Sequence, residues 1–447
     1  MPFETDVIVV GGGLAGLTTA FRLSQKGLKV VLLESRPALG GRTASWIQDG
    51  MPMESGLHRY LGFYVALPRL LRDAGLQIND VLVWEDSVEI RSVHPNKHAV
   101  FHLAPWHRPF KTLSSWIANN HFVSLSQKYQ LIQFFIRGIA AAQHHPHELD
   151  QISIKAYAEH RRLDPELIHT VITPLSTGIF FLPITHYSAL AFFGLFLAGL
   201  PTLGKLRVGA FAGGMTDVLA APLGQAITRL GVQVRLNEPV KQLIVSHGQV
   251  VGVTTHKENL FAKHVVLAAS LAPAQGILKE SLPASDWLTS LTSLPSTPVV
   301  TFQAELSRPL MPYDHTTFGP GTALASFSEQ SRTTFRHAPG RISVILANPK
   351  RYINQSDQVI AQTIIIDSAR LGLPIADIIT RYRITRLPND FYSLQPGYNH
   401  LRPSQRTPIP GLVLAGDYTQ QPWFGTMEGA VVSGEIAARI VATTRST

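Results

Sequence analysis

Apolar and polar residues follow one another in blocks along the chain, and the first blocks predict a strand, a helix and a second strand. Residues 6–10 form a short apolar run, and residues 28–33 form another. Between them, apolar residues recur at helical spacing over residues 14–23. Short runs that are apolar throughout are typical of strands buried on both faces of a parallel sheet. The N-terminal segment is therefore predicted to be a βαβ unit.

The turn between the first strand and the helix carries three spaced glycines, Gly11, Gly13 and Gly16. In such a unit the first glycine permits a tight turn, the second lets the backbone approach a pyrophosphate, and the third lets the helix pack close to the strand. The helix N-terminus favours negative charge. Glu34 ends the second strand, where its carboxylate is placed to bind an adenosine ribose and would repel a 2′-phosphate. The motif predicts dinucleotide binding.

The residues directly after Glu34 extend this motif. Gly40 and Gly41 permit close backbone approach, and Arg36 and Arg42 are placed to meet phosphates. The competing interpretation is a basic surface turn.

The composition limits the classes of function. The 447 residues, 45% of them hydrophobic, suffice for a large core and two lobes. Because the chain has no cysteine, disulfides, Cys-ligated zinc, iron–sulfur clusters and a cysteinyl-flavin bond are excluded. The net charge of +9 suits an anionic membrane surface, whereas no nucleic-acid motif is present. The first strand begins almost at residue 1, so we expect no leader peptide and a cytoplasmic protein, peripheral on the inner face of a membrane.

Two apolar regions stand in the middle of the chain. A helical region is predicted from Trp116 to Ile139, and residues 188–200 form an apolar segment of thirteen residues. A membrane-spanning helix needs about 20 residues. The second segment is therefore either a buried helix that lines an apolar cavity or a monotopic helix that dips into one leaflet. The histidines between residues 144 and 148 are expected in a solvated loop, and no metal site is predicted.

The C-terminal segment carries the second strong signal. A strand over 412–414 leads to Gly416 and Asp417, and a helix begins near Met427. The strand would deliver Asp417 to the phosphate–ribityl end of a flavin cofactor. The N–H groups at the start of the helix would face the electron-rich edge of the isoalloxazine and stabilise the anionic reduced flavin.

Together these motifs resemble those of the FAD-dependent phytoene and ζ-carotene desaturases of the plant and cyanobacterial type, within the flavin amine oxidase superfamily. The resemblance rests on residues 54–64, 313–315, 402–408, 415–421 and 427–434. It covers most of the chain, although residues 100–205 match only loosely. Gln420 and residues 422–425 depart from the family pattern, which leaves the particular isoprenoid open.

The resemblance implies an α/β fold with an α+β substrate lobe. A Rossmann-like FAD-binding domain of the amine oxidase and carotenoid desaturase type is expected over residues 1–76, 206–289 and 401–447. An interleaved substrate-binding, membrane-facing domain is expected over residues 77–205 and 290–400. The FAD-binding residues that follow are Gly11, Gly13, Leu14, Ala15, Gly16, Glu34, Ser35, Arg36, Gly40, Gly41, Arg42, Val240, Ala269, Gly416, Asp417, Thr426, Met427 and Ala430.

The family further implies the removal of hydrogen from a long apolar isoprenoid, with hydride transfer to flavin N5 and reoxidation by a quinone-like acceptor. Candidate catalytic residues are His58, Arg402 and Tyr418, each of which also has an interpretation as a positioning or structural residue. The alternatives are a flavin amine oxidase that acts on a small amine, an FAD-dependent squalene-type enzyme or carotene isomerase, and a flavin-binding protein without catalysis.

Overall fold

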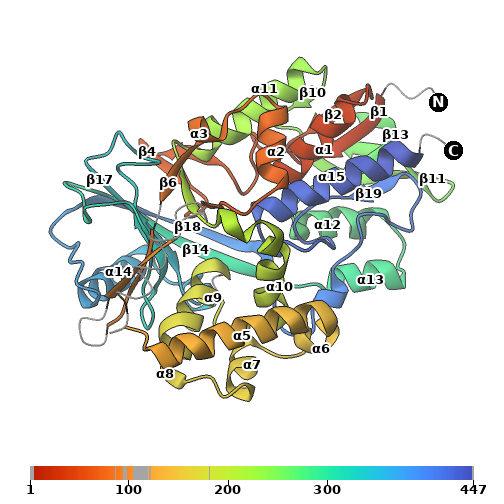
Figure 1. The fold of residues 1–447 in the computed structure, drawn as a ribbon. Helices are drawn as coiled ribbons and strands as arrows, with labels where there is room; N and C mark the ends of the chain where they lie inside the picture. The colour runs from red at the N-terminus through yellow and green to blue at the C-terminus, as the bar shows by residue number, and fades with distance from the viewer. Residues whose placement is uncertain are drawn as a thin grey trace.

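Figure 1 shows the arrangement of the elements in a computed structural model, which describes residues 5–85, 87–93, 98–103, 119, 122–180 and 182–444. Two seven-stranded sheets lie on different sides of the molecule, and a group of helices lies below them in this view. The first and the last described residues, Thr5 and Thr444, lie on the side of the first sheet. The predicted α/β class is confirmed.

The first sheet has the strand order β10-β2-β1-β13-β12-β11, and β19 pairs with β13. Strands β10, β2, β1, β13 and β19 run parallel. Ile8 and Val9 in β1 are fully buried, because both faces of the sheet are covered. The seven strands are β1 (Thr5–Val10), β2 (Val30–Leu33), β10 (Gln233–Arg235), β11 (Val240–Ser246), β12 (Gln249–Thr255), β13 (Asn259–Leu267) and β19 (Leu412–Leu414).

Helices α1 (Leu14–Ser24) and α15 (Met427–Thr444) lie against each other beside this sheet (Figure 1). A Cβ atom at Gly434 would lie 2.5 Å from the Ala15 carbonyl oxygen, so the crossing requires glycine there. This contact joins the N-terminal and C-terminal motifs. Helices α11 (Ala221–Arg229) and α12 (Leu271–Ser281) contact the sheet at β10 and β11. Helix α2 (Ala66–Asp73) packs against α15, α3 (Ile78–Val81) against α2, and α13 (Asp286–Ser293) against α12.

The second sheet has the order β18-β14-β17-β16-β15-β7-β8. Helix α14 (Asp357–Arg370) packs on one face around an apolar cluster that includes Phe302 and Val344. The other face is polar: Gln303 Nε2 donates to the Glu54 carbonyl oxygen at 2.7 Å. Its strands are β7 (Ser87–Arg91), β8 (His98–His102), β14 (Ser296–Leu306), β15 (Thr316–Phe318), β16 (Leu324–Glu329), β17 (Gly340–Leu346) and β18 (Ile379–Tyr392).

The two apolar regions in the middle of the chain form packed helices. Helix α10 (Ala189–Gly199) begins at Ser188, whose hydroxyl accepts from the Leu190 N–H, and most of its residues are buried. Helix α5 (Leu125–His144) packs against it. The buried interpretation of the 188–200 segment is therefore the one that the structure supports. Neighbouring helices are α6 (Pro146–Asp150), α7 (Ile154–His160), α8 (Pro165–Leu167) and α9 (Thr173–Phe180).

Two of the predicted boundaries were wrong. The helix predicted from Trp116 to Ile139 runs over Leu125–His144, and Trp116 itself lies outside the described residues. The predicted loop at 144–148 is the end of α5 and the start of α6, because Pro146 stands at the first position of a new helix, where its fixed φ is favourable. Its histidines are exposed as expected.

Two small sheets connect the larger parts. β3 (Ser45–Gln48) and β4 (Met51–Glu54) form a hairpin. β5 (Arg59–Leu61), β9 (Val208–Phe211) and β6 (Leu82–Glu85) form a three-stranded sheet that joins segments from both sides of the expected domain boundaries. The division into two domains stays a prediction.

Candidate functional site

The glycine turn after β1 is as tight as its sequence predicts. Gly11 has φ +110°, and a Cβ there would lie 2.8 Å from the Ala268 carbonyl oxygen and 3.0 Å from the Ala269 nitrogen. A Cβ at Gly16 would lie 1.9 Å from the Gly11 carbonyl oxygen. Both positions therefore exclude any side chain. Leu14 and Ala15 open α1 directly behind the turn, at the helix end that favours negative charge.

The second glycine segment lies against the first. The Gly40 N–H donates to the Gly12 carbonyl oxygen at 2.9 Å, and Gly13 and Gly40 form a parallel bridge. Gly40 and Gly41 both have positive φ, at +123° and +58°. Two stretches of backbone without side chains thus form one cradle at the N-terminus of α1.

The Glu34 carboxylate faces this cradle. One oxygen accepts from the Gly12 N–H at 2.6 Å, and the other accepts from the Arg36 N–H at 2.8 Å and from the Ser35 hydroxyl at 3.1 Å. A carboxylate offers about four acceptor positions, so capacity remains for ligand hydroxyls. The Glu34 carbonyl accepts from the Glu238 N–H, which brings the start of β11, at Val240, near the same edge.

Arg42 connects this cradle to the C-terminal motif. Its Nη2 lies 2.5 Å from Asp417 Oδ1, and Asp417 Oδ2 is buried without a partner among the described residues. Gly416 is fixed by donation to the Ser433 hydroxyl at 2.9 Å. The Arg42 guanidinium also lies 4.8 Å from the centre of the Phe391 ring. The unsatisfied Asp417 oxygen is an acceptor that a ribityl hydroxyl would fill.

The N-terminus of α15 is the last part of the candidate cofactor site. Thr426 caps the helix by accepting from the Gly429 N–H at 3.1 Å, and Met427 and Ala430 lie in its first turn. The first N–H groups of an α-helix have no partner within the helix, so they are available to an electron-rich ring edge. Glu428 has a separate use, because its carboxylate accepts the N–H groups of Val65, Ala66 and Leu67 at 2.6–2.8 Å.

The three candidate catalytic side chains differ in their surroundings. His58 lies between Glu54, with Nδ1 3.6 Å from Oε2, and the Ser55 hydroxyl, 3.4 Å from Nε2. Tyr418 is buried with its hydroxyl unpaired within the described residues, and burial raises the pKa of that hydroxyl far above its usual value. The Arg402 guanidinium donates to the carbonyls of residues 418, 419 and 421, a geometry that supports a positioning role for it.

An apolar wall separates the start of α15 from α10. The rings of Phe63 and Trp423 stack with centroids 5.9 Å apart. Glycines of α10 receive neighbouring rings: a Cβ at Gly194 would lie 2.6 Å from Phe424, and one at Gly199 would lie 2.9 Å from Phe63. The apolar helix is therefore packed directly against the residues that precede α15.

The roles of two residues in this region, Asp390 and Glu428, were not predicted from the sequence. Asp390 stands at the end of β18, and its backbone carbonyl accepts from Arg42 at 3.4 Å. Burial raises the pKa of its carboxyl, and Arg42 opposes that effect. The Glu428 side chain, in the first turn of α15, has no predicted role in the sequence. Nothing in the local sequence around either residue indicates its partner, because both partners come from distant segments.

The glycine cradle, the Glu34 carboxylate and the unsatisfied Asp417 oxygen together fit an extended dinucleotide that ends in a flavin. Fold and site thus define an FAD-dependent oxidoreductase. Within the described residues, no group of three or more histidine, aspartate and glutamate side chains is placed to hold a metal ion.

Residues 14–442 match the family model for flavin containing amine oxidoreductases, and the chain belongs to that family. It is 27% identical to a chloroplastic/chromoplastic 15-cis-phytoene desaturase of an Oncidium hybrid cultivar, over 98% of this chain and 77% of the relative. It is 24% identical to a zeta-carotene desaturase of Synechocystis sp., over 97% and 96%. An oxidoreductase from Methanosarcina mazei has the same fold, with a TM-score of 0.76, 16% identity and coverage of 99% and 100%.

In the part of the chain that the structure describes, no helix has both the length and the apolar character needed to cross a membrane.

Proposed function

We propose that this enzyme desaturates a long apolar isoprenoid related to phytoene or ζ-carotene. The observation that carries the proposal is the apolar wall of Phe63, Trp423 and Phe424, which packs into α10 next to the start of α15. These rings are only 4–7% exposed, so they make the surroundings of the start of α15 apolar, which suits a hydrocarbon chain better than a small polar amine. The names of the relatives, 15-cis-phytoene desaturase and zeta-carotene desaturase, support the same substrate class.

Bound FAD supplies the hydride acceptor for this reaction, and a quinone-like molecule reoxidises it. The residues of the chain hold and orient the reactants. The predicted FAD-binding residues hold the cofactor by backbone N–H groups and by the carboxylates of Glu34 and Asp417. The apolar wall excludes water and aligns the substrate. His58, which lies between Glu54 and Ser55, is the side chain best placed to accept a proton.

The same proposal includes peripheral membrane association, because the substrate is apolar. Helix α5 presents Leu125, Tyr129, Ile132 and Ile136 to solvent, each more than half exposed. At about 100° per residue, these four side chains fall within an arc of roughly 60° on one side of the helix. The positive net charge favours the anionic inner face of a membrane. This exposed apolar surface lies on α5, which packs against α10 (Ala189–Gly199), most of whose residues are buried.

The experiment is anaerobic bleaching of the flavin absorbance. The purified holoenzyme is mixed with liposomes that carry phytoene, ζ-carotene or a squalene derivative, and separately with a panel of amines. Bleaching by an isoprenoid alone, reversed by a quinone, is the expected result. Bleaching by an amine would overturn the proposal in favour of an amine oxidase. Conversion of carotene isomers by pre-reduced enzyme, without net oxidation, would assign an isomerase instead.

Membrane association has its own test in liposome flotation. Ile132→Glu on the exposed side of α5 is expected to reduce co-flotation with anionic liposomes at least several-fold. Ile366→Glu is the matched control, because Ile366 is equally exposed, at 51%, but lies on α14. Equal flotation of both variants would contradict the assignment to α5.

A further inference from the structure

The second sheet ends in a long edge strand. β18 (Ile379–Tyr392) pairs with β14, and it stands at the end of the strand order. The Tyr382 carbonyl accepts from Nη1 of the Arg383 side chain at 2.8 Å. In an antiparallel pair, the N–H and C=O of one residue point to the same side. Tyr382 therefore directs both groups away from β14, toward the open side of the sheet.

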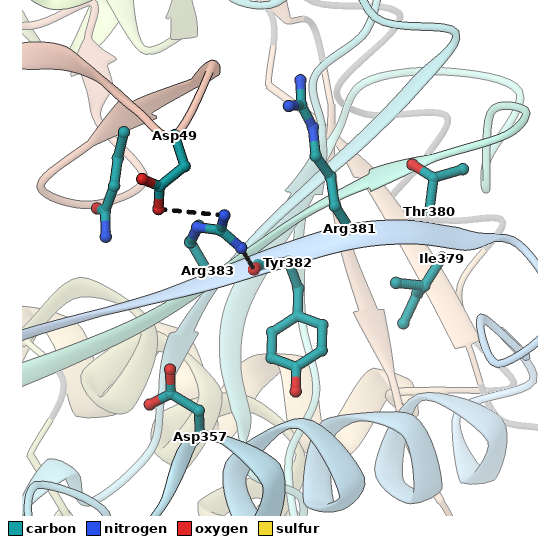
Figure 2. Close-up of a pocket in the computed structure, with 8 residues that line it drawn as sticks. Asp49, Asp357, Ile379, Thr380, Arg381, Tyr382 and Arg383 are labelled. Carbon is teal, nitrogen blue, oxygen red and sulfur yellow. Dashed lines mark hydrogen bonds and ion pairs between the residues drawn. The ribbon is translucent and has the colours of Figure 1, made fainter.

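An open hollow of about 690 Å³ lies along this edge. Five consecutive residues of β18, 379–383, line it, and Figure 2 shows them along one strand. Gln48, at the end of β3, also lines the hollow. Asp49, in the hairpin turn, stands on one side of the strand, and Asp357 at the start of α14 stands on the other (Figure 2). The hollow thus occupies the position that one more strand of the sheet would take.

The length and cross-section of the hollow fit a single extended peptide segment. Five residues in a strand span roughly 17 Å, at about 3.4 Å per residue. The volume of the hollow divided by this length gives a cross-section of about 40 Å². One strand in a layered sheet occupies about 4.8 Å by 10 Å, or roughly 48 Å². A globular ligand of the same volume would not pair with the open backbone edge of β18.

We propose that an extended peptide segment of a partner protein binds in this hollow and adds a strand to β18. Main-chain hydrogen bonds to Tyr382 supply the affinity, as in other cases of strand addition. Its carbonyl oxygen, which already accepts from Arg383, has a second lone pair for the peptide N–H. The side chains around the hollow define the chemistry of the peptide. Acidic residues face Arg383, and apolar residues alternate with them to face Tyr382.

The interactions of the Arg383 guanidinium support an acidic partner peptide. Its Nε is buried and has no partner among the described residues, and its Nη2 reaches only Asp49, at 3.2 Å. The Asp49 side chain is 72% exposed, so this ion pair is a weak surface pair that a peptide carboxylate can replace. A peptide carboxylate in place of Asp49 would pair with Nη2, which is the end of the guanidinium on the side of Asp49.

A second copy of this chain fits the hollow less well. If β18 of one copy paired antiparallel with β18 of another through residues 379–383, Arg381 of one strand would lie directly opposite Arg381 of the other. Like charges directly opposite one another destabilise a strand pair. The charge pattern therefore favours a different, acidic segment. This inference is independent of the substrate and survives if the proposed function fails.

The test uses a fluorescein-labelled seven-residue peptide of alternating valine and glutamate, titrated with FAD-loaded enzyme in fluorescence anisotropy. Saturable binding is expected up to millimolar enzyme. The same peptide with alternate amides N-methylated is expected to bind at least tenfold more weakly, because it cannot form the ladder. This control needs no change in the protein.

Two variants complete the test. Tyr382→Pro removes the outward N–H at a position where an edge strand tolerates proline, and Arg383→Gln removes the charge. Each is expected to weaken binding about tenfold or more with unchanged FAD content. Arg370→Gln, on the exposed side of α14, is expected to bind like wild type. Absence of saturable binding, or equal binding of the N-methylated peptide, would overturn the proposal. A dimer that Tyr382→Pro dissociates would overturn it in favour of a second copy.

Discussion

The carboxylate of Glu428 connects two parts of the site, and its removal has a calculable effect. Glu428 lies in the first turn of α15, is fully buried, and accepts the N–H groups of Val65, Ala66 and Leu67 at distances of 2.7, 2.6 and 2.8 Å. These N–H groups begin α2, where no intrahelical acceptor exists. The carboxylate thus caps α2 from another helix and fixes the chain that leads into it.

The magnitude follows from the hydrogen bonds. Glu428→Ala leaves the N–H groups of Ala66 and Leu67 buried without acceptors, at about 1–3 kcal/mol each. With the lost side-chain volume, we expect the free energy of unfolding to fall by about 3–5 kcal/mol. Glu428→Gln retains one acceptor oxygen and the shape of the side chain, so we expect a loss of about 1–3 kcal/mol.

The assay is urea unfolding, followed by far-UV circular dichroism at one fixed excess of FAD, because bound cofactor itself adds to stability. The matched control is Glu435→Gln on the same helix. Glu435 forms ion pairs with Arg22 and Arg69 near the surface, at 2.8 and 2.5 Å. Its loss is expected to change the free energy of unfolding by about 1 kcal/mol or less.

The order of the three variants in loss of unfolding free energy tests whether the Glu428 carboxylate caps α2. If Glu428→Ala were no more destabilising than Glu435→Gln, the carboxylate would not be the cap of α2, and the reasoning from its three hydrogen bonds would be refuted. If Glu428→Gln were as damaging as Glu428→Ala, the negative charge rather than the number of acceptors would be the decisive property.

Three further predictions concern other parts of the molecule. Burial, with a smaller effect of His102, lowers the pKa of His315 from 6.5 to about 4. As pH falls from 6.5 to 4, the unfolded state therefore binds the proton first and stability declines, by at most about 1.4 kcal/mol per pH unit and by less because the ring is only partly buried. In His315→Gln the urea midpoint should vary less across this window. Gly194→Ala should lower the melting temperature, because the added Cβ would lie 2.6 Å from Phe424. Phe424→Leu, combined with Gly194→Ala in one protein, should restore part of the loss. If the two losses simply added, the contact between these residues would be contradicted. Glu34→Gln places an amide NH₂ against a backbone N–H. The affinity of the apoprotein for FAD, measured by fluorescence titration, should therefore fall about tenfold or more. Unchanged affinity would show that the Glu34 carboxylate does not order the glycine cradle.

The sequence alone determined the features in which a single residue type meets a local steric demand. Gly11 and Gly16 are required by contacts of 2.8 and 1.9 Å that any Cβ would make, and their spacing is visible in the chain. The apolar runs of β1 and β2 likewise predicted a buried parallel sheet. These features depend on neighbours in sequence or on a repeated βαβ pattern, so the α/β class and the cofactor were predictable.

Only the tertiary structure decided which distant groups meet. It buried most of α10 and one apolar side of α5, and it left the side of α5 that carries Ile132 and Ile136 exposed. The sequence pattern marks both helices as apolar but does not specify which neighbour covers each face. It also placed Glu428 at the start of α2 and Asp390 beside Arg42. Such pairs are formed by the packing of segments far apart in the chain, and no periodicity or propensity encodes them. The sequence therefore determined the cradle for the cofactor, and the packing of the fold decided the surroundings in which it works.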